Sequence, residues 1–462
     1  MTATTHRTAE EIGRTELGPR ALPPLGATRE VPLPDVTDVT LPSGLRVLAA
    51  HRPGVPMAEL RLRVPFAPDA ADPATVEHHL AAAELLSATL LTGTATRDRV
   101  AIDDELAGVG ADVGVSVDPE RLQLGGSGLA SGLPTILEVV ADVLTGATHP
   151  DAEVLRERTR LIERITVARA QPRTIAREAL QRKRFGEHPL AHEVPTGPDV
   201  AAVEPVDVRT LHRTGLVPER AILTLVGDID AESGVALVDR HLAGWSATHA
   251  ARELSPPPVP APSNLELVQR TGSVQSQLRL SAPGLRRLDD RYAALQLANL
   301  VFGGYFSSRW MENIREDKGY TYGAHSGTEF VPGGAVLSLE TDVATEVTAA
   351  ALLETRYELG RMAVVPPTPD EVDAARRYAV GSLLISLDSQ GGYASTLSML
   401  AADGVPVQWL RDHPGRLEAV TADDVAAAAQ QFFAPSVFTG VIVGDADVIG
   451  PGLRALGQVD LP

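Results

Sequence analysis

The chain has 462 residues, of which 44% are hydrophobic and 22% are charged, a composition typical of globular proteins with two or more cores. Its net charge of −19 and lack of basic clusters argue against nucleic acid as a partner. The absence of cysteine excludes disulfides, thiolate metal ligands and a cysteine nucleophile. No stretch has the roughly 18 apolar residues of a membrane span, and the N-terminus lacks a signal-peptide core. We therefore expect a cytoplasmic protein without membrane contacts.

The first half of the chain alternates predicted strands with predicted helices. Residues 1–30 mix charges with Thr, Gly and Pro, which favours a disordered arm. Apolar and polar residues then alternate around turns, which predicts antiparallel strands. The predicted strands are 39–49, 57–66, a hairpin over 110–129 that turns at Asp118-Pro119, and 217–227. The predicted helices are 75–91, 100–108, 133–144, 151–168, 173–185 and 231–243.

After this first unit, the sequence SPPPVPAPS, which begins at Ser255, predicts a linker because proline cannot continue a helix or a central strand. Beyond it, short strings repeat in the same order. LRV at 62–64 matches LRL at 278–280, Pro150-Asp151 matches Pro369-Asp370, and LVGDID at 225–230 matches IVGDAD at 442–447. The offsets are 216, 219 and 217 residues, which indicates an internal repeat.

We therefore predict an α+β fold of two homologous domains, each an antiparallel β-sheet with helices packed on one face, joined by the proline-rich linker. The predicted division is a disordered arm at 1–30, an N-terminal domain at 31–250, a linker at 251–264 and a C-terminal domain at 265–462. The low share of aromatic residues, 4%, predicts aliphatic cores.

Residues 302–327, FGGYFSSRWMENIREDKGYTYGAHSG, carry the highest density of chemically useful side chains. A Gly-Gly pair leads into an amphipathic segment, then a charged turn closed by Gly319, then a β-prone run. Arg315 precedes the turn and Tyr322 follows it, so a guanidinium and a phenol could converge on one carbonyl or carboxylate. In isolation the same pair is also typical of a surface Arg and a half-buried strand Tyr.

The two-copy layout, the opening TLPSGLRVL, the closing VGD strand and above all GGYFSSRWMENIREDKGYTYG resemble the pitrilysin/insulinase family of zinc metallopeptidases, and especially its processing-peptidase branch. The resemblance covers roughly residues 35–460. Catalytic members carry His-x-x-Glu-His on the first helix and a further Glu downstream. Two His at i and i+4 hold Zn²⁺, and the Glu between them activates a metal-bound water.

This chain has no His-x-x-Glu-His motif. When Thr92-Gly93-Thr94 is aligned with the family's glycine, Glu84, Ser87 and Ala88 stand at the His, Glu and His positions, and Glu163 lies in the region of the third ligand. One carboxylate with Ser and Ala cannot form a tight zinc site, so the resemblance implies a degenerate motif and no metal on this chain.

Two histidine clusters are the alternatives for a metal. His78 and His79 are adjacent and point in different directions from a helix. His188 and His192 have i,i+4 spacing with Glu193 beside them, but the Gly and Pro residues around them favour a loop. Neither a Gly-x-Ser-x-Gly elbow nor a phosphate-binding loop is present.

In two-chain members of the family one subunit brings the zinc helix, and the other, with a degraded motif, brings the Arg and Tyr. The resemblance therefore implies a non-catalytic subunit that is inactive alone and forms a heterodimer with a homologous zinc-binding subunit. Arg315 and Tyr322 would contact the substrate or transition state of peptide hydrolysis in a closed chamber. Such pairs act in general peptide turnover or in peptide natural-product maturation. The alternative is a structural or assembly protein of the same fold without a proteolytic role.

Overall fold

The computed structural model describes residues 32–68, 73–192, 194–247 and 249–462. The arm predicted at residues 1–30 lies outside the described residues. The chain divides into two compact units, Met1–Pro34 and Asp35–Pro462. All helices and strands that the structure describes belong to the larger unit.

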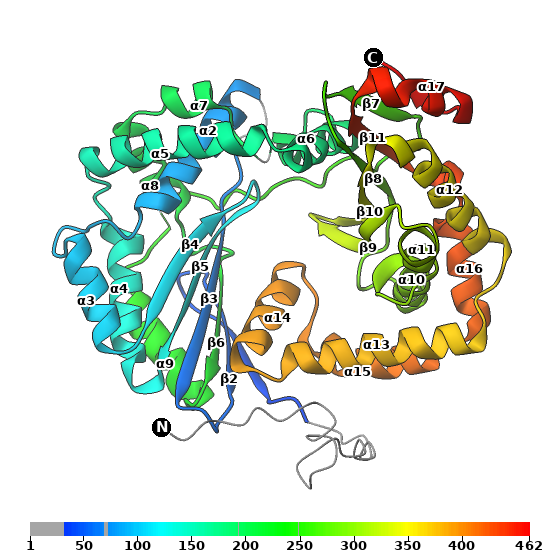
Figure 1. The fold of residues 1–462 in the computed structure, drawn as a ribbon. Helices are drawn as coiled ribbons and strands as arrows, with labels where there is room; N and C mark the ends of the chain where they lie inside the picture. The colour runs from blue at the N-terminus through cyan, green and yellow to red at the C-terminus, as the bar shows by residue number, and fades with distance from the viewer. Residues whose placement is uncertain (1–31, 69–72, 193, 248) are drawn as a thin grey trace, which may run out of the picture. The chain divides into compact units, whose positions relative to one another are not determined.

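The first β-sheet has six strands in the spatial order β1-β2-β6-β3-β5-β4 (Figure 1). The β2–β6 pair is parallel and the other neighbouring pairs are antiparallel. Along β3, Ala58, Leu60, Leu62 and Val64 are buried on one face, as the period-two pattern predicts. The strands are β1 (Val36–Thr40), β2 (Arg46–His51), β3 (Met57–Pro65), β4 (Asp112–Val117), β5 (Arg121–Leu129) and β6 (Ile222–Gly227).

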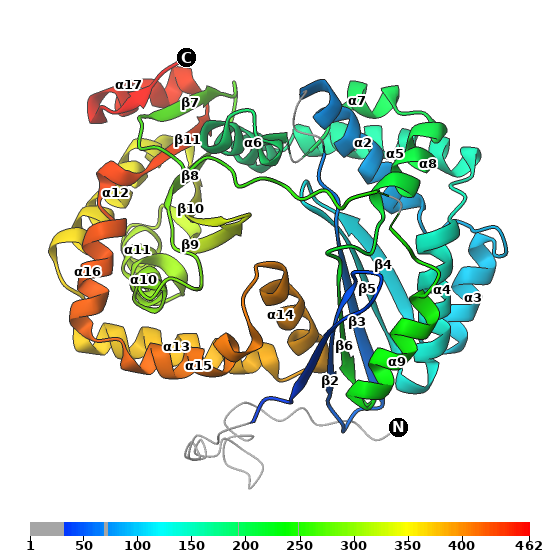
Figure 2. The same cartoon turned by 180° about the vertical axis from the view of Figure 1, so that it is seen from behind.

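The second sheet repeats this arrangement in the order β12-β7-β11-β8-β10-β9 (Figure 2). The sequence matches fall on equivalent elements, because LRV lies in β3 and LRL in β8, while LVG ends β6 and IVG ends β11. Here β7 runs parallel to both β11 and β12. The strands are β7 (Leu265–Gln269), β8 (Gln275–Pro283), β9 (Thr321–Val331), β10 (Gly334–Ala344), β11 (Thr439–Gly444) and β12 (Val459–Asp460).

The predicted α+β class with two repeated sheet-and-helix domains is confirmed, and the parallel pairs refine the predicted antiparallel order. Ser255–Pro262, in the predicted linker, has neither helix nor strand. The domain boundaries at 250 and 264 stay predictions.

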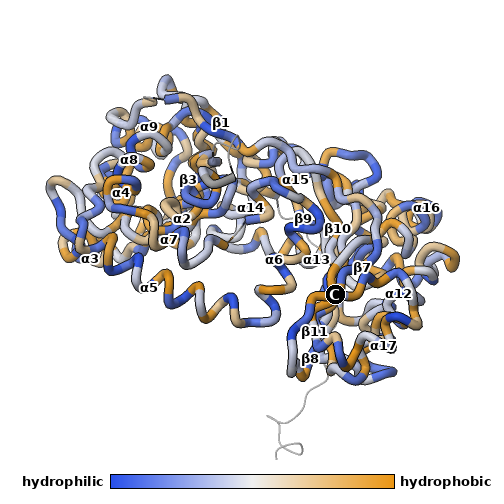
Figure 3. Tube along the Cα trace, turned by 90° about the horizontal axis from the view of Figure 1, so that it is seen from above, coloured by the Kyte–Doolittle hydropathy of each residue, from blue (hydrophilic) through white to orange (hydrophobic). Residues whose placement is uncertain are grey.

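Helices α2 to α9 precede the proline-rich stretch and α10 to α17 follow it. Several begin with a capping box. At the start of α13, the Thr368 side chain accepts a hydrogen bond from the Glu371 backbone amide, and the Glu371 side chain accepts one from the Thr368 backbone amide. Both hydrophobic and hydrophilic residues occur along α5 (Figure 3), and its buried residues, Val154, Leu161 and Ile165, have the spacing of one face of a helix. The helices of the first half are α2 (Pro73–Thr89), α3 (Arg99–Gly108), α4 (Leu133–Gly146), α5 (Asp151–Arg169), α6 (Pro172–Phe185), α7 (Gly197–Ala202), α8 (Pro205–Gly215) and α9 (Ala231–Leu242). Those of the second are α10 (Tyr292–Asn299), α11 (Arg309–Met311), α12 (Thr348–Val364), α13 (Pro369–Leu387), α14 (Gln390–Ala402), α15 (Val407–Ala419), α16 (Ala422–Phe432) and α17 (Ala446–Leu456).

The core of the first domain is aliphatic, as predicted from the low aromatic content. It is built mainly from Leu, Val, Ile and Ala, with Phe66 and Trp245 as its aromatic members. Burial of these side chains supplies the main favourable contribution to folding.

The two domains exchange helices. α6, from the first half, packs on β8 and β11 of the second sheet, while α14, from the second half, packs on β3 and β6 of the first (Figure 1). Each sheet therefore carries its own helices on one face and a helix of the other domain on the opposite face. The faces beneath the exchanged helices are polar: Arg61 and Arg63 of β3 donate to the hydroxyls of Ser395 and Ser398 on α14 over 3.2 and 2.9 Å. The prediction that helices cover one face of each sheet therefore holds for the helices of that sheet's own domain.

Candidate functional site

The segment that carries Arg315 and Tyr322 runs from the end of α10 into β9, the edge strand of the second sheet. It contains two π-helical stretches, η3 (Leu300–Gly304) and η4 (Glu312–Asp317), and ends in β9. Gly319 closes the turn with a φ of +64°, a left-handed conformation that glycine adopts without steric cost. π-Helical turns inside helices are frequent at functional sites.

The structure brings Arg315 and Tyr322 together. The guanidinium carbon of Arg315 lies 5.5 Å from the centroid of the Tyr322 ring and 4.5 Å from that of Phe306, within the range of cation–π contacts. Its ion-pair partner is the neighbouring Glu316, at 3.4 Å. Tyr322 is 93% exposed, so its ring and hydroxyl face solvent. The pair can therefore present a cation and a phenol to the same external group.

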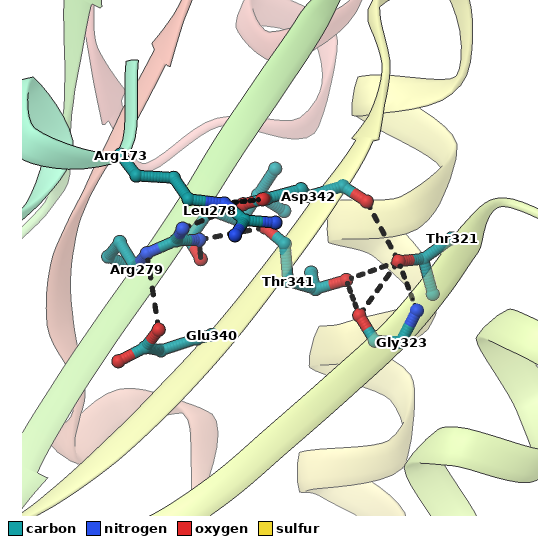
Figure 4. A network of polar contacts seen from close by, with 8 residues as sticks. All are labelled: Arg173, Leu278, Arg279, Thr321, Gly323, Glu340, Thr341 and Asp342. Carbon is teal, nitrogen blue, oxygen red and sulfur yellow. Dashed lines mark hydrogen bonds and ion pairs between the residues drawn. The ribbon is translucent and has the colours of Figure 1, made fainter. Parts of the chain in front are cut away.

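A β-bulge sets the direction of Tyr322. In the pairing of β9 with β10, Thr341 lies opposite Ala324 and Val343 opposite Thr321, so Tyr322 and Gly323 together face one residue. The Thr321 hydroxyl lies 2.7 Å from the backbone oxygen of Asp342 and 2.8 Å from that of Gly323, and it can donate its one proton to either (Figure 4). Bulges change the direction of a side chain, and this one lies at the exposed edge of the sheet.

Buried side chains of the same segment fix it to the helices behind it. Arg309, which is 6% exposed, donates two hydrogen bonds to Glu371 at the start of α13, over 2.6 and 2.8 Å. These bonds hold the pKa of Glu371 at about 2, well below its usual value. Trp310 stacks on Phe302 with ring centroids 5.4 Å apart.

Asn313 completes this anchoring by donating to Glu354 and Glu358 of α12 over 3.0 and 2.8 Å. Sequence reasoning did not assign roles to Arg309, Trp310 or Asn313. All three lie in the GGYFSSRWMENIREDKGYTYG run, which was the available signal, but their hydrogen-bond partners are 41 or more residues away in the chain.

A cavity of about 910 Å³ adjoins Tyr322, between α6 and the polar face of the second sheet. Its wall includes Arg279, which is 6% exposed and is held by Asp342 at 2.7 Å and Glu340 at 3.6 Å (Figure 4). Arg173 of α6 also contacts Asp342 at 2.7 Å. The charges on this wall are largely neutralised by one another.

The positions expected for zinc ligands do not form a metal site. Glu84 on α2 is partly buried, and burial raises the pKa of its carboxyl, which disfavours the anionic form that binds metals. The Ser87 hydroxyl donates to the Glu84 backbone oxygen over 2.9 Å, and Ala88 is exposed and has no donor atom. Glu163 is an exposed residue of α5. These residue types do not fit a zinc ion.

The histidine alternatives also find other partners. His79 contacts the Phe66 carbonyl over 2.8 Å, and burial lowers its pKa to about 4. His188 accepts from the Leu190 amide and contacts the Ser255 carbonyl, whereas His192 faces Glu77 at 3.5 Å. The predicted neighbour Glu193 lies outside the described residues.

Across the part of the chain that the structure describes, no three His, Asp or Glu side chains are grouped as metal ligands. Within the same residues, no helix is long and apolar enough to cross a membrane.

Comparisons with known proteins agree with this architecture. The model of the family "Insulinase (Peptidase family M16)" matches residues 79–196, and that of "Peptidase M16 inactive domain" matches residues 202–378. An uncharacterized zinc protease of Streptomyces coelicolor is 26% identical over 436 residues, with 93% of this chain and 92% of that protein covered. The β subunit of the mitochondrial processing peptidase of Lentinula edodes is 20% identical, with 91% of each chain covered.

Among solved structures, a peptidase M16 inactive domain from Pseudomonas fluorescens superposes with a TM-score of 0.79 at 24% identity, over 89% of this chain and 98% of that one. This likeness shows the fold. The two family models together match more than half of the chain, and the structure has the two repeated sheets that the resemblance implies. The chain therefore belongs to the insulinase family of peptidases, family M16.

Proposed function

We propose that this chain is the non-zinc subunit of a two-chain M16 peptidase, in which Arg315 and Tyr322 contact the peptide substrate. The observation that carries the proposal is the contrast between the two halves. An exposed phenol and a guanidinium lie together at the edge of the second sheet, while α2 offers Glu84, Ser87 and Ala88 in place of zinc ligands. A homologous subunit with an intact motif would supply the metal-bound water that attacks the peptide bond.

The chemical task of the pair is to bind and stabilise. A scissile carbonyl gains negative charge as it becomes tetrahedral, and donors aimed at that oxygen stabilise the transition state. Arg315 has one ion-pair partner, the neighbouring Glu316, and the Tyr322 phenol is exposed, so both have donors available for a substrate oxygen. The buried contacts of Arg309 and Trp310 hold both groups in place before substrate arrives.

The test reconstitutes the pair from separately purified chains. The candidate partner is the homologous subunit with His-x-x-Glu-His, found by co-purification and mass spectrometry. We expect the present chain alone to bind no stoichiometric zinc and to cleave no unstructured peptide, and the mixture to cleave it. Arg315→Ala should lower kcat/KM by about 10²-fold, and Tyr322→Phe by about 10-fold or more, since each removes a donor to the developing charge.

Tyr357→Phe is the matched control, because Tyr357 is also exposed, at 58%, but belongs to α12 and not to the segment itself. It should leave kcat/KM unchanged. Zinc-dependent cleavage by the isolated chain would refute the proposal. Full activity of both site variants in the reconstituted pair would instead favour the structural or assembly role.

A further inference from the structure

The internal repeat places two arginines at equivalent positions in the two sheets. Arg63 is the central residue of LRV in β3, and Arg279 is the central residue of LRL in β8. In the register of the sheets, Arg63 lies opposite Gln123 of β5, and Arg279 lies opposite Glu340 of β10. Both arginines lie on the polar face that an exchanged helix of the other domain covers.

Arg279 has a full set of partners. Its guanidinium contacts Asp342 at 2.7 Å and Glu340 at 3.6 Å, and also donates to the backbone oxygens of Leu278 and Thr341 (Figure 4). Two carboxylates thus neutralise one buried cation, as a buried charge requires.

Arg63 lacks this compensation. The residues equivalent to Glu340 and Asp342 are Gln123 and Gly125, so neither carboxylate is present. The Nε of Arg63 donates to the Ser398 hydroxyl over 2.9 Å, and within the described residues its two Nη groups have no hydrogen-bond or ion-pair partner. The Gln123 amide is itself used, because it donates to Asp118 over 3.1 Å.

The unpaired guanidinium lines a cavity of about 680 Å³ between the first sheet and the end of α14. The Arg63 side chain is half-buried, and burial, followed by the charge of Arg121, lowers the pKa of its guanidinium. The three carboxylates whose negative charges act on Arg63 are already bound to other groups. Glu120 pairs with Arg121, Asp403 pairs with Arg287, and Asp118 accepts from Gln123. An anion entering the cavity would therefore meet a cation that has a fork of free donors and no competing partner.

We propose that Arg63 binds a peptide carboxylate in this cavity, in the place that Asp342 and Glu340 take beside Arg279. A planar carboxylate matches the two-pronged guanidinium. A doubly charged phosphate is less suited, because the other arginines that line the cavity, Arg46, Arg121 and Arg220, are paired with Asp38, Glu120 and Glu253, so that among the lining residues Arg63 alone would balance its charge. The choice of a peptide as the ligand rests on the proposed function. The site itself requires neither a partner subunit nor hydrolysis.

The test is calorimetric titration of the isolated full chain with four probes. They are an N-acetylated Ser-Gly-Ser-Gly-Leu peptide with a free C-terminus, the same peptide amidated, an amidated peptide with one added Glu, and inorganic phosphate. We expect a carboxylate-bearing peptide to bind at least about 10-fold more tightly than the neutral peptide, since a charge-assisted bidentate contact is gained. Comparing the peptide that has a free C-terminus with the amidated peptide that carries Glu shows whether Arg63 prefers a C-terminal or a side-chain carboxylate.

Two variants remove the site in independent ways. Arg63→Gln should abolish the preference for carboxylate. Gly125→Asp should do the same by giving Arg63 the partner that Asp342 gives Arg279, and a Cβ at Gly125 meets only the Arg61 Cδ at 3.8 Å. Gly125→Asn is the matched uncharged control and should keep the preference, as should Arg315→Ala, which affects only the proposed catalytic contact.

Equal affinity for the charged and neutral peptides in the natural chain would overturn the proposal. So would carboxylate binding that persists in Gly125→Asp, or phosphate binding as tight as that of the peptide. None of these results would bear on reconstituted cleavage, so the two proposals can fail separately.

Discussion

Replacing His149 with Asn should make the protein less sensitive to acid, because His149 is a buried histidine that accepts a proton at a much lower pH in the folded state than in the unfolded chain. It is 0% exposed and lies against the C-terminal end of α2. The Thr89 hydroxyl donates to the Leu85 carbonyl over 2.7 Å, so the Nδ1–H of His149 must donate to Thr89, over 2.8 Å. Among the residues that the structure describes, the Nε2 atom is then a buried acceptor without a partner. Burial, followed by the charges of His212 and Arg209, lowers the pKa of His149 to about 3.

The magnitude follows from the difference between the folded and unfolded pKa values. The unfolded chain takes up a proton near pH 6.5, while the folded protein does not until about pH 3, so the contribution to stability is present above pH 6.5 and is lost as pH falls toward 3. Between pH 7.5 and 5.0 the loss amounts to about 2 kcal/mol, because each pH unit below 6.5 costs about 1.4 kcal/mol. Asn removes this titration, and it tolerates the φ of +44° at position 149.

Urea unfolding followed by tryptophan fluorescence at pH 7.5, 6.5, 5.5 and 5.0 measures the effect. The natural chain should lose about 2 kcal/mol more unfolding free energy over this range than His149→Asn does. Thr89→Val serves as the control, since it removes the hydroxyl but leaves the buried imidazole, and the pH dependence should remain. An identical pH dependence in the natural chain and His149→Asn would refute the reasoning.

Two further predictions concern packing. The first tests a contact behind the Arg315–Tyr322 segment, and the second tests a close approach of two strands in the first sheet. Arg309→Leu should lower the free energy of unfolding by about 3 kcal/mol, because it leaves the Glu371 carboxylate without its main partner, and the double variant with Glu371→Gln should recover part of the loss. Urea unfolding at pH 7.5 measures both, and a change below about 0.5 kcal/mol for the single variant would contradict it. Gly227→Ala should destabilise by about 1–3 kcal/mol, since a Cβ there would lie 2.4 Å from the Met57 carbonyl oxygen in the first sheet. Gly244→Ala, where a Cβ meets nothing within 4 Å, should have little effect. Thermal melts of both variants measure the difference, and equal melting temperatures would argue against this close approach.

Much of the fold could be read from local patterns. The alternation in 57–66 and the unbroken helical run in 75–91 specify β3 and α2, because the burial of one face depends on residue spacing alone. The strings LRV and LRL, and LVGDID and IVGDAD, identified the repeat because equivalent strands need equivalent side chains. The parallel pairs could not be predicted, since pairing direction depends on where distant strands meet.

For the site, the sequence by itself determined which chemistry was available. Through the family resemblance it put Glu84, Ser87 and Ala88 at the expected positions of metal ligands, and it placed Arg315 and Tyr322 on either side of a turn at Gly319. Only the tertiary structure decided which side chains contact one another. The contact of Arg315 with the Tyr322 ring depends on a bulge against β10, and the unpaired state of Arg63 depends on Gln123 and Gly125 of another strand. Side-chain partners that are distant in the chain are chosen by packing, so residue spacing alone does not reveal them.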